Sequence, residues 1–447
     1  MNLEEQVLVR VKPTPEEETR INEIAAALQA RVMGTEAARG HDIQPYLVGS
    51  IAKNTHLKDP DADMFLLFDP AVPRETLEKV GLAIGREAIA GREHYAEHPY
   101  IKGEFMGLRA DIVPAYRIID SSQKMTAVDR TPFHTEFVKA ELAPELRDDV
   151  RLLKAFMKGI GAYGADAKTM GFSGYLCEIL IIRFGGFRKL LENASNWRYG
   201  IRLEFGEKTE RKFDGPMTFI DPVDPNRNVA SAVSQDNFAL FIAAARAYLG
   251  EPSLQFYFPE PVMPLKADEL NRAFKGRGGI LAIKMPRPDL IDDVLYTQMR
   301  KFERNAATLL DKNGFSVMDS ASHAMEKCLV IILELQNAEL PVAMLHRGPP
   351  VHVADNAMDF IKKWRSSPDA MSPPFIKDGC WHVFARRKHT HAASLLESGL
   401  KDMDAGKDLN ALKDRARIFQ KIPKEENILR ALSSYADRRM PWERLHS

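Results

Sequence analysis

The chain has few cysteines and no long apolar run. The spacing of Cys177, Cys328 and Cys380 argues against both a Cys-x-x-Cys zinc site and a disulfide framework. No uninterrupted apolar segment approaches the roughly 18 residues that a membrane span needs. The first residues lack the basic and apolar regions of a signal peptide. We therefore expect a cytoplasmic protein without a membrane segment.

An excess of either charge is also missing, because 62 Lys and Arg residues balance 62 Asp and Glu residues. This balance lowers the expectation of tight nonspecific RNA binding, although a basic face can coexist with acidic helices elsewhere. The 447 residues, of which 45% are hydrophobic, suffice for two to four globular domains. Composition alone indicates no more than this.

An acidic motif that follows a Gly-Ser pair gives the first indication of chemistry. Asp61 and Asp63 are two residues apart on an expected strand, so their side chains point the same way and repel each other unless a cation lies between them. Such oxygen ligands suit Mg²⁺ that also binds substrate phosphates. Gly49-Ser50 offers backbone N–H groups and a hydroxyl to phosphate oxygens. The pattern favours metal-assisted nucleotide transfer; the alternative is that Asp59-Pro60-Asp61 only caps a loop.

A third carboxylate, Asp111, lies in a predicted hairpin formed by residues 95–101 and 104–113, with its turn at Lys102-Gly103. Two-metal catalysis needs one carboxylate that bridges both ions, one that completes the nucleotide-side ion and one on the ion that activates the attacking hydroxyl. Ions about 3.5–4 Å apart can be held from adjacent strands. Taken alone, Asp111 is better explained as an ordinary charge at a strand end.

These motifs resemble the nucleotidyltransferase superfamily that includes DNA polymerase β. Further segments narrow the resemblance to the archaeal-type (class I) CCA-adding enzymes, which are tRNA nucleotidyltransferases. They are Tyr95-Ala-Glu-His-Pro-Tyr100, Ala127-Val-Asp-Arg-Thr-Pro-Phe-His134, Val150-Arg-Leu-Leu-Lys154, Gly171-Phe-Ser-Gly-Tyr-Leu-Cys-Glu178 and Asp221-Pro-Val-Asp-Pro-Asn-Arg-Asn-Val229. The resemblance extends over nearly the whole chain and weakens after about residue 340.

The resemblance implies an α+β protein with a polymerase β-like nucleotidyltransferase head, a helical central domain and an α/β C-terminal body and tail. We place these parts at residues 1–143, 144–262 and 263–447. Within them the sequence predicts a helix that starts with the capping box Thr14-Pro15-Glu16-Glu17 and ends at Gly34. It also predicts a helix from Asp148 to Lys158, a helix from Ala324 onward and a hairpin over residues 375–384.

The implied activity is addition of CCA to tRNA 3′ ends from CTP and ATP without a nucleic-acid template, with two Mg²⁺ ions and release of pyrophosphate. Asp61 and Asp63 are expected on the nucleotide-side ion, Asp63 as the bridge, and Asp111 on the ion that activates the ribose hydroxyl. One alternative is a base-restricted enzyme, such as a poly(A) polymerase or an A-adding enzyme. Another is a noncatalytic RNA-binding protein. The oligomeric state stays open, with a homodimer as one option.

Nucleotide contacts follow from the same resemblance. Lys154 shares one side of a helix with Arg151 and Lys158; alone this indicates a solvated basic stripe, but the family implies that Lys154 contacts the triphosphate. The family also implies nucleotide contacts for Gly49, Ser50, Lys53, His134 and Tyr163, and a base contact for Arg227. Lys53 stands where the family has arginine, so that contact loses the bidentate guanidinium fork.

A basic cluster, Arg386-Arg387-Lys388, directly follows the second strand of the hairpin predicted near the C-terminus. The family implies that this end of the chain grips tRNA, and such a cluster suits RNA phosphates and 2′-hydroxyls. A solvated strand end is an equally good explanation.

Overall fold

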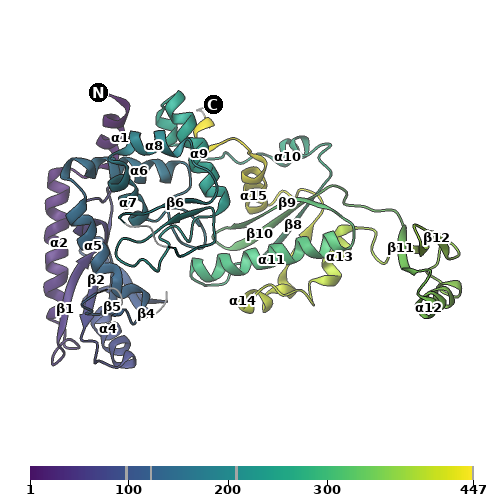
Figure 1. Cartoon of the computed structure of the whole chain (residues 1–447), viewed down its shortest axis with the longest axis horizontal. Coiled ribbons are helices and arrows are strands. Elements are labelled where there is room, and N and C mark those ends of the chain that lie inside the picture. The colour runs from purple at the N-terminus through teal and green to yellow at the C-terminus, as the bar shows by residue number, and fades with distance from the viewer. Residues whose placement is uncertain (96–98, 121–122, 207–209, 445–447) are drawn as a thin grey trace. The chain divides into compact units, whose positions relative to one another are not determined.

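A computed structural model describes residues 1–95, 99–120, 123–206 and 210–444 and divides the chain into two compact units (Figure 1). Unit 1 comprises Met1–Pro261, Ile291–Asp293 and Arg439–Ser447, and unit 2 comprises Val262–Leu290 and Val294–Arg438. The mixture of helices and sheets confirms the α+β class. The boundaries 1–143, 144–262 and 263–447 stay predictions.

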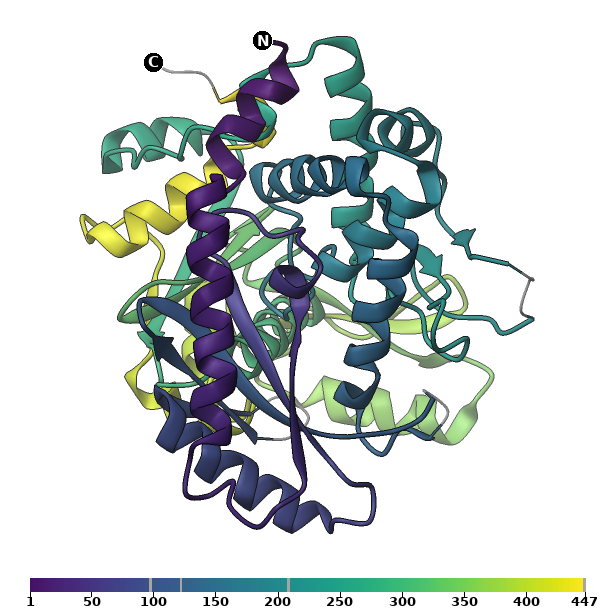
Figure 2. The ribbon, with the colours of Figure 1, turned by 90° about the vertical axis from the view of Figure 1, so that its left-hand side faces the viewer.

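A five-stranded mixed sheet in the order β1-β2-β5-β4-β3 begins unit 1. β2 and β5 are parallel neighbours, and the other pairs are antiparallel. The buried residues of α2 and α4 pack on one face of this sheet, and Figure 2 shows α2 running lengthwise beside β1. The strands are β1 (Ile43–Val48), β2 (Asp61–Phe68), β3 (Ala90–Tyr95), β4 (Pro99–Phe105) and β5 (Leu108–Tyr116); the helices are α2 (Pro15–Met33), α3 (Gly49–Ala52) and α4 (Arg74–Ala88).

Local sequence explains α2 directly. The Thr14 hydroxyl accepts from the Glu17 N–H while the Glu17 carboxylate accepts from the Thr14 N–H, which confirms the predicted capping box. The helix ends at Met33 with Gly34 as its C-cap. Its buried residues recur at helical spacing and enter the core against the sheet, which fixes the helix on that face.

The turn between the strands that lead to Asp111 differs from the prediction. β4 runs through Lys102 and Gly103 to Phe105, and the two-residue turn is Met106-Gly107. Gly103 belongs inside the strand because its missing side chain lets β3 approach, where a Cβ would lie 2.3 Å from the Ala90 carbonyl oxygen. Of the predicted first strand, residues 96–98 lie outside the described part of the chain.

The rest of unit 1 is a helical bundle with an aromatic core. Phe156 of α6 contacts the rings of Phe187, Tyr248 and Phe256 in that core. The Trp442 ring stacks on Phe256 at 5.1 Å, so the last described segment returns to this unit. The elements are α1 (Leu3–Val11), α5 (Thr131–Glu141), α6 (Arg147–Gly159), α7 (Gly174–Phe184), α8 (Phe187–Ala194), α9 (Gln235–Gly250) and the paired strands β6 (Ile201–Leu203) and β7 (Met217–Phe219).

Unit 2 contains a four-stranded sheet in the order β14-β8-β10-β9 and a three-stranded sheet in the order β11-β13-β12. The helix predicted from Ala324 onward is wrong, because this segment ends β9 and continues as β10. The elements are β8 (Gly279–Pro286), β9 (Val317–Ala324), β10 (Cys328–Leu335), β11 (Ala343–Pro350), β12 (Phe375–Lys377), β13 (Cys380–Arg386), β14 (Arg417–Phe419), α10 (Ala267–Ala273), α11 (Asp292–Lys312), α12 (Ala354–Arg365), α13 (Ala392–Gly399), α14 (Lys407–Asn410) and α15 (Glu426–Ala436).

Candidate functional site

Two neighbouring parallel strands bring the three predicted carboxylates together. Asp63 of β2 is the register partner of Asp111 of β5, and Asp61 precedes Asp63 by two residues. Side chains two residues apart on a strand share a face, so all three carboxylates meet on one side of the sheet. This is the arrangement that the sequence predicts for the acidic motif.

The Gly-Ser pair abuts these carboxylates. Gly49 has a φ of +72° and opens the short helix α3, directly after β1. A Cβ at this position would lie 2.0 Å from Asp63 Oδ2, so only glycine allows the backbone so close to the carboxylate. Ser50 follows Gly49 in α3 and lines the same cavity as Asp61 and Asp63.

Two cations that the sequence analysis did not single out neutralise part of this acidic group. Lys102 Nζ lies 3.4 Å from Asp111 Oδ2 and 3.9 Å from Asp61 Oδ2, and Arg109 Nε donates to Asp61 Oδ1. Lys102 is the register partner of Asp111 on β4, and Arg109 is that of Asp61 on β5. The alternation of β4 and β5 could have identified Lys102, had the turn been placed correctly.

The electrostatics of Asp63 and Asp111 still favour an additional cation. Burial, together with the repulsion from Asp111 and Asp61, raises the pKa of Asp63 to about 7. Burial also raises the pKa of Asp111, and its buried Oδ1 has no hydrogen-bond partner. Among the described residues, no three His, Cys, Asp or Glu side chains are gathered as a ready metal site. The donor set nonetheless fits an oxygen-seeking ion such as Mg²⁺.

Glu178, a residue without an assigned role in the sequence analysis, joins two predicted phosphate ligands. Lys154 Nζ donates to Glu178 Oε1 at 2.9 Å and to Thr55 Oγ1 at 3.0 Å, and Lys53 Nζ donates to Glu178 Oε2. Burial opposes ionisation of Glu178, but the attraction of Lys154 and Lys53 outweighs it and lowers the pKa of Glu178 to about 2. The carboxylate therefore holds both ammonium groups in fixed positions.

A cavity of about 230 Å³ lies over these groups. Its lining includes Ser50, Asp61, Asp63, Lys154, Lys158 and Tyr163. The Tyr163 ring lies under the Lys158 ammonium, 5.3 Å from ring centroid to Nζ, and burial raises the pKa of the Tyr163 hydroxyl. The lining of the cavity thus combines carboxylates with ammonium groups and a phenol.

Asp221 connects the other two predicted nucleotide contacts. His134 Nε2 lies 2.8 Å from Asp221 Oδ2, and Arg227 Nη1 donates to the same oxygen at 2.9 Å. The Tyr175 hydroxyl donates to Asp221 Oδ1 at 3.3 Å, and its ring stacks on the imidazole with a centroid distance of 4.1 Å. Burial opposes ionisation of Asp221, but the hydrogen bonds from His134 and Arg227 lower its pKa to about 2. The Tyr175 ring also lies 5.9 Å from Lys53 Nζ, which links this group to the phosphate side.

The predicted RNA-binding cluster lies in unit 2, at and after the end of β13. Arg386 and Lys388 are exposed. The Arg387 guanidinium instead donates to the Asn313 carbonyl oxygen at 3.2 Å and packs near Gly314. Two of the three cations are thus directed to solvent.

Comparison with known proteins identifies the family of this chain. Residues 35–134 match the nucleotidyltransferase domain, residues 148–258 the second domain of tRNA nucleotidyltransferase, and residues 277–420 the C-terminal domain of the CCA-adding enzyme. The CCA-adding enzyme of Haloarcula marismortui is 37% identical over 410 residues, which cover 88% of each chain. This chain belongs to the CCA-adding enzyme family.

Other CCA-adding enzymes are similar over as much of their length. That of Methanocaldococcus jannaschii is 38% identical over 88% of this chain and 89% of its own, and that of Thermoplasma volcanium is 36% identical over 96% and 95%. The solved structure of a cytoplasmic RNA terminal U-transferase is 13% identical, with a TM-score of 0.44 over 58% of this chain and 98% of that chain. Among the described residues, no helix is both long and apolar enough to cross a membrane.

Proposed function

We propose that this member of the CCA-adding enzyme family adds C, C and A to the 3′ end of tRNA from CTP and ATP and releases pyrophosphate. The observation that carries the proposal is the convergence of Asp61, Asp63 and Asp111 beside Gly49-Ser50, in a chain whose relatives match it almost end to end. Phosphoryl transfer of this kind depends mainly on positioning and charge neutralisation. A cytoplasmic location and a homodimer stay predictions.

Divalent metal use follows from the nucleotidyltransferase family, and we assign two Mg²⁺ ions to the three carboxylates. Asp61 and Asp63 would hold the ion on the nucleotide side, with Asp63 as the bridge, and Asp111 would hold the other. Bound there, the ions neutralise phosphate charge and lower the pKa of the attacking hydroxyl. The unpartnered Asp111 Oδ1 supports this assignment because a buried carboxylate oxygen normally has a partner. In the structure, Lys102 pairs with Asp111 and Asp61, and Arg109 pairs with Asp61, which offsets part of the repulsion between the carboxylates.

We assign each of the remaining predicted residues to the triphosphate or to the base. Ser50, Lys53, Lys154 and Tyr163 would position the triphosphate, with Glu178 as a positioning residue that orients both ammonium groups. His134 and Arg227 would position the base. Among the described residues, the Arg227 guanidinium donates to Asp221 through Nη1, so its other N–H groups would remain for acceptors on cytosine and adenine.

The experiment that tests the function uses tRNA that lacks its 3′ CCA. We expect Mg²⁺ with CTP alone to add two cytidines, and CTP with ATP to add the complete CCA. Sequencing of the products distinguishes this outcome from a base-restricted enzyme, which would add one kind of nucleotide only. No extension under any of these conditions would favour a noncatalytic RNA-binding protein and would contradict the proposal.

The basic cluster gives a separate prediction about RNA. If Arg386, Arg387 and Lys388 contact tRNA phosphates, the Arg386→Ala/Arg387→Ala variant should bind tRNA more weakly, with a salt dependence reduced by about one unit of slope per lost contact. Because Arg387 already donates to Asn313, most of the effect should come from Arg386. Titration of labelled tRNA at several salt concentrations measures both quantities. An unchanged salt slope would show that the cluster is only a solvated strand end.

A further inference from the structure

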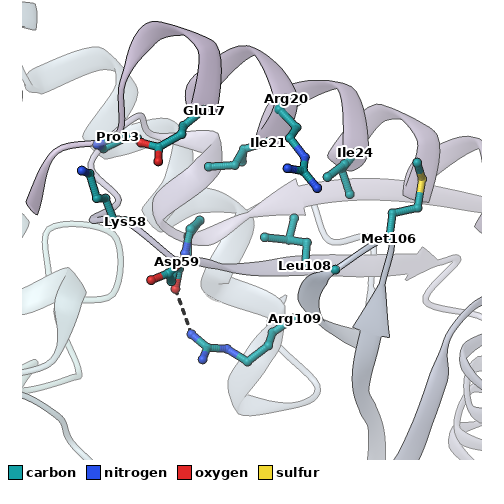
Figure 3. A pocket seen from close by; sticks show the side chains of 12 residues that line it. Pro13, Glu17, Arg20, Ile21, Ile24, Lys58, Asp59, Met106, Leu108 and Arg109 are labelled. Atoms are coloured by element: carbon teal, nitrogen blue, oxygen red, sulfur yellow. Dashed lines mark hydrogen bonds between the residues drawn. The ribbon is translucent and has the colours of Figure 1, made fainter.

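A second and larger cavity adjoins the candidate site in unit 1. It has a volume of about 530 Å³ and lies between α2, the loop before β2 and the turn from β4 to β5 (Figure 3). Lys58, Asp59, Pro60 and Arg109 line both this cavity and the smaller one over the carboxylates. A ligand of the larger cavity would therefore lie directly beside the reaction.

The rim of this larger cavity has more basic than acidic side chains, the acidic ones being Glu17 and Asp59. It carries Arg20, Lys58 and Arg109 (Figure 3). Within the described part of the chain, the side chains of Arg20 and Lys58 have no hydrogen-bond or ion-pair partner, whereas the Glu17 carboxylate accepts a hydrogen bond from the Thr14 N–H in the capping box of α2. Arg109 Nη2 donates to the Asp59 carbonyl oxygen at 2.8 Å and closes one end of the cavity. Such a rim suits a phosphate group.

The floor is apolar, which a bare phosphate or pyrophosphate would not use. Ile21 and Ile24 of α2 and Leu108 of β5 form it, and they are at most 9% exposed. Figure 3 shows these side chains facing the space from two sides, with Met106 at the end of the row. An apolar floor under a rim with cations suits a nucleotide, whose nucleobase would lie on the floor and whose phosphate would lie at the rim.

Met106 is an unusual residue for its place in the backbone. The two-residue turn Met106-Gly107 has φ values of +51° and +81°, and Met106 is 64% exposed. In the corresponding turn between β12 and β13, the first position is Asp378, a residue type that tolerates a positive φ. Methionine at φ > 0 is strained, and here the side chain gains no burial in return. A ligand that covers Met106 would explain the choice.

We propose that this larger cavity holds a nucleotide unit of the RNA strand upstream of the reacting 3′ end, with its base over Met106 and the apolar floor and its phosphate between Arg20 and Lys58. The inference rests on the proposed function, because it places RNA rather than free nucleotide there. We assign the triphosphate to the smaller cavity, whose lining includes Lys154 and Lys158, and the residues shared by the two cavities would give the strand a path to the carboxylates.

The test uses three variants of the full chain. Arg20→Ala removes a rim cation that lines only the larger cavity, Met106→Asn removes the apolar cover, and Arg39→Ala is a matched control at an exposed arginine outside it. The measurements are the Kd for tRNA that lacks its terminal A, the KM for CTP and ATP, and the thermal midpoint. Arg20→Ala should raise the Kd for tRNA about fivefold to tenfold and lower the salt slope by about one. Met106→Asn should raise this Kd about threefold and also raise the thermal midpoint, because asparagine tolerates the turn better.

The outcomes separate the possible explanations. If the Met106-Gly107 turn is only structural, Met106→Asn will change the thermal midpoint but not the Kd for tRNA. That result would overturn the proposal, and so would an unchanged Kd for tRNA in Arg20→Ala. A raised KM for CTP and ATP with an unchanged Kd for tRNA would assign the cavity to free nucleotide and would also overturn it. If the wild type itself neither binds nor extends tRNA, the proposed function fails; if it does both and the variants match it, only the cavity assignment fails.

Discussion

The Asp63→Asn variant should lose nucleotide addition and yet, in the absence of metal, be more stable than the wild type above pH 7. The amide keeps the shape of the carboxylate but cannot serve as a bridging anion, so addition should fall by several orders of magnitude. In the wild type, burial and the negative charges of Asp111 and Asp61 oppose ionisation of the Asp63 carboxylate. The neutral amide avoids this penalty, and the variant therefore gains stability. Both effects have one cause, the concentration of negative charge that a metal ion would relieve.

The pH dependence of this gain has a definite sign. The pKa of Asp63 is about 7 in the folded protein against an ordinary value of 3.8, so the folded state binds more protons between these values and the wild type loses stability as the pH rises through this window. One pKa unit corresponds to about 1.4 kcal/mol, which sets an upper bound of about 4 kcal/mol on the penalty above pH 7. The advantage of Asp63→Asn should therefore be full at pH 8 and absent at pH 4.

Thermal unfolding in a chelator at pH 4 and pH 8 measures this difference. Addition of Mg²⁺ at pH 8 should raise the midpoint of the wild type and leave Asp63→Asn almost unchanged, since binding to the folded state alone stabilises it. Asp214→Asn, at an exposed carboxylate in the same unit, is the matched control and should show neither effect. Equal midpoints of Asp63→Asn and wild type at pH 8 would contradict the buried-charge argument, and retained addition would contradict the metal assignment.

The sequence predicts those parts of the fold and site whose signals are local. The capping box and the helical spacing of Ile21, Ile24 and Leu28 define α2 almost to the residue, because the interactions that start and bury a helix lie within a few turns. The alternation of side chains along β2 likewise places Asp61 and Asp63 together. The position of Asp111 beside them depends on one further feature, the parallel pairing of β5 with β2.

An apolar run was ambiguous where both of its faces are buried. The eight residues of β10 are all buried, so they lack the alternation that distinguishes a strand, and their pattern also fits the helix that the sequence predicts after Ala324. The β-branched residues Val330, Ile331 and Ile332 were the available signal for a strand.

The charge partners of the site could not be predicted for a different reason. Glu178 meets Lys53 across 125 positions of the chain, and Asp221 meets His134 across 87. No local pattern encodes such pairs, because they depend on how α3, α5 and α7 pack. The motifs that resemble the family contain both acids, but nothing in a motif says which cation each one faces. The structure supplies this information, and it leads to the second large effect.

Glu178→Gln should destabilise the protein by about 3–5 kcal/mol, because breaking a buried ion pair leaves an uncompensated charge. Here two ammonium groups, those of Lys53 and Lys154, would lose their shared partner in a region that is almost inaccessible to water. The pKa of Glu178 is about 2 against an ordinary value of 4.5, so its contribution is fully present above pH 4.5 and is lost only as the pH falls towards 2. The deficit should therefore be the same at pH 6 and pH 8.

A triphosphate should reverse part of this loss. If Lys53 and Lys154 face the phosphates, CTP should raise the thermal midpoint of Glu178→Gln more than that of the wild type, since its charge replaces the missing carboxylate. The double variant Lys53→Met/Glu178→Gln removes one of the stranded cations and should recover stability, which keeps the test decisive even if the single variant folds poorly. Glu192→Gln, at an exposed glutamate on α8, is the matched control. Equal stabilisation of wild type and Glu178→Gln by CTP would show that the two lysines serve the fold and not the nucleotide.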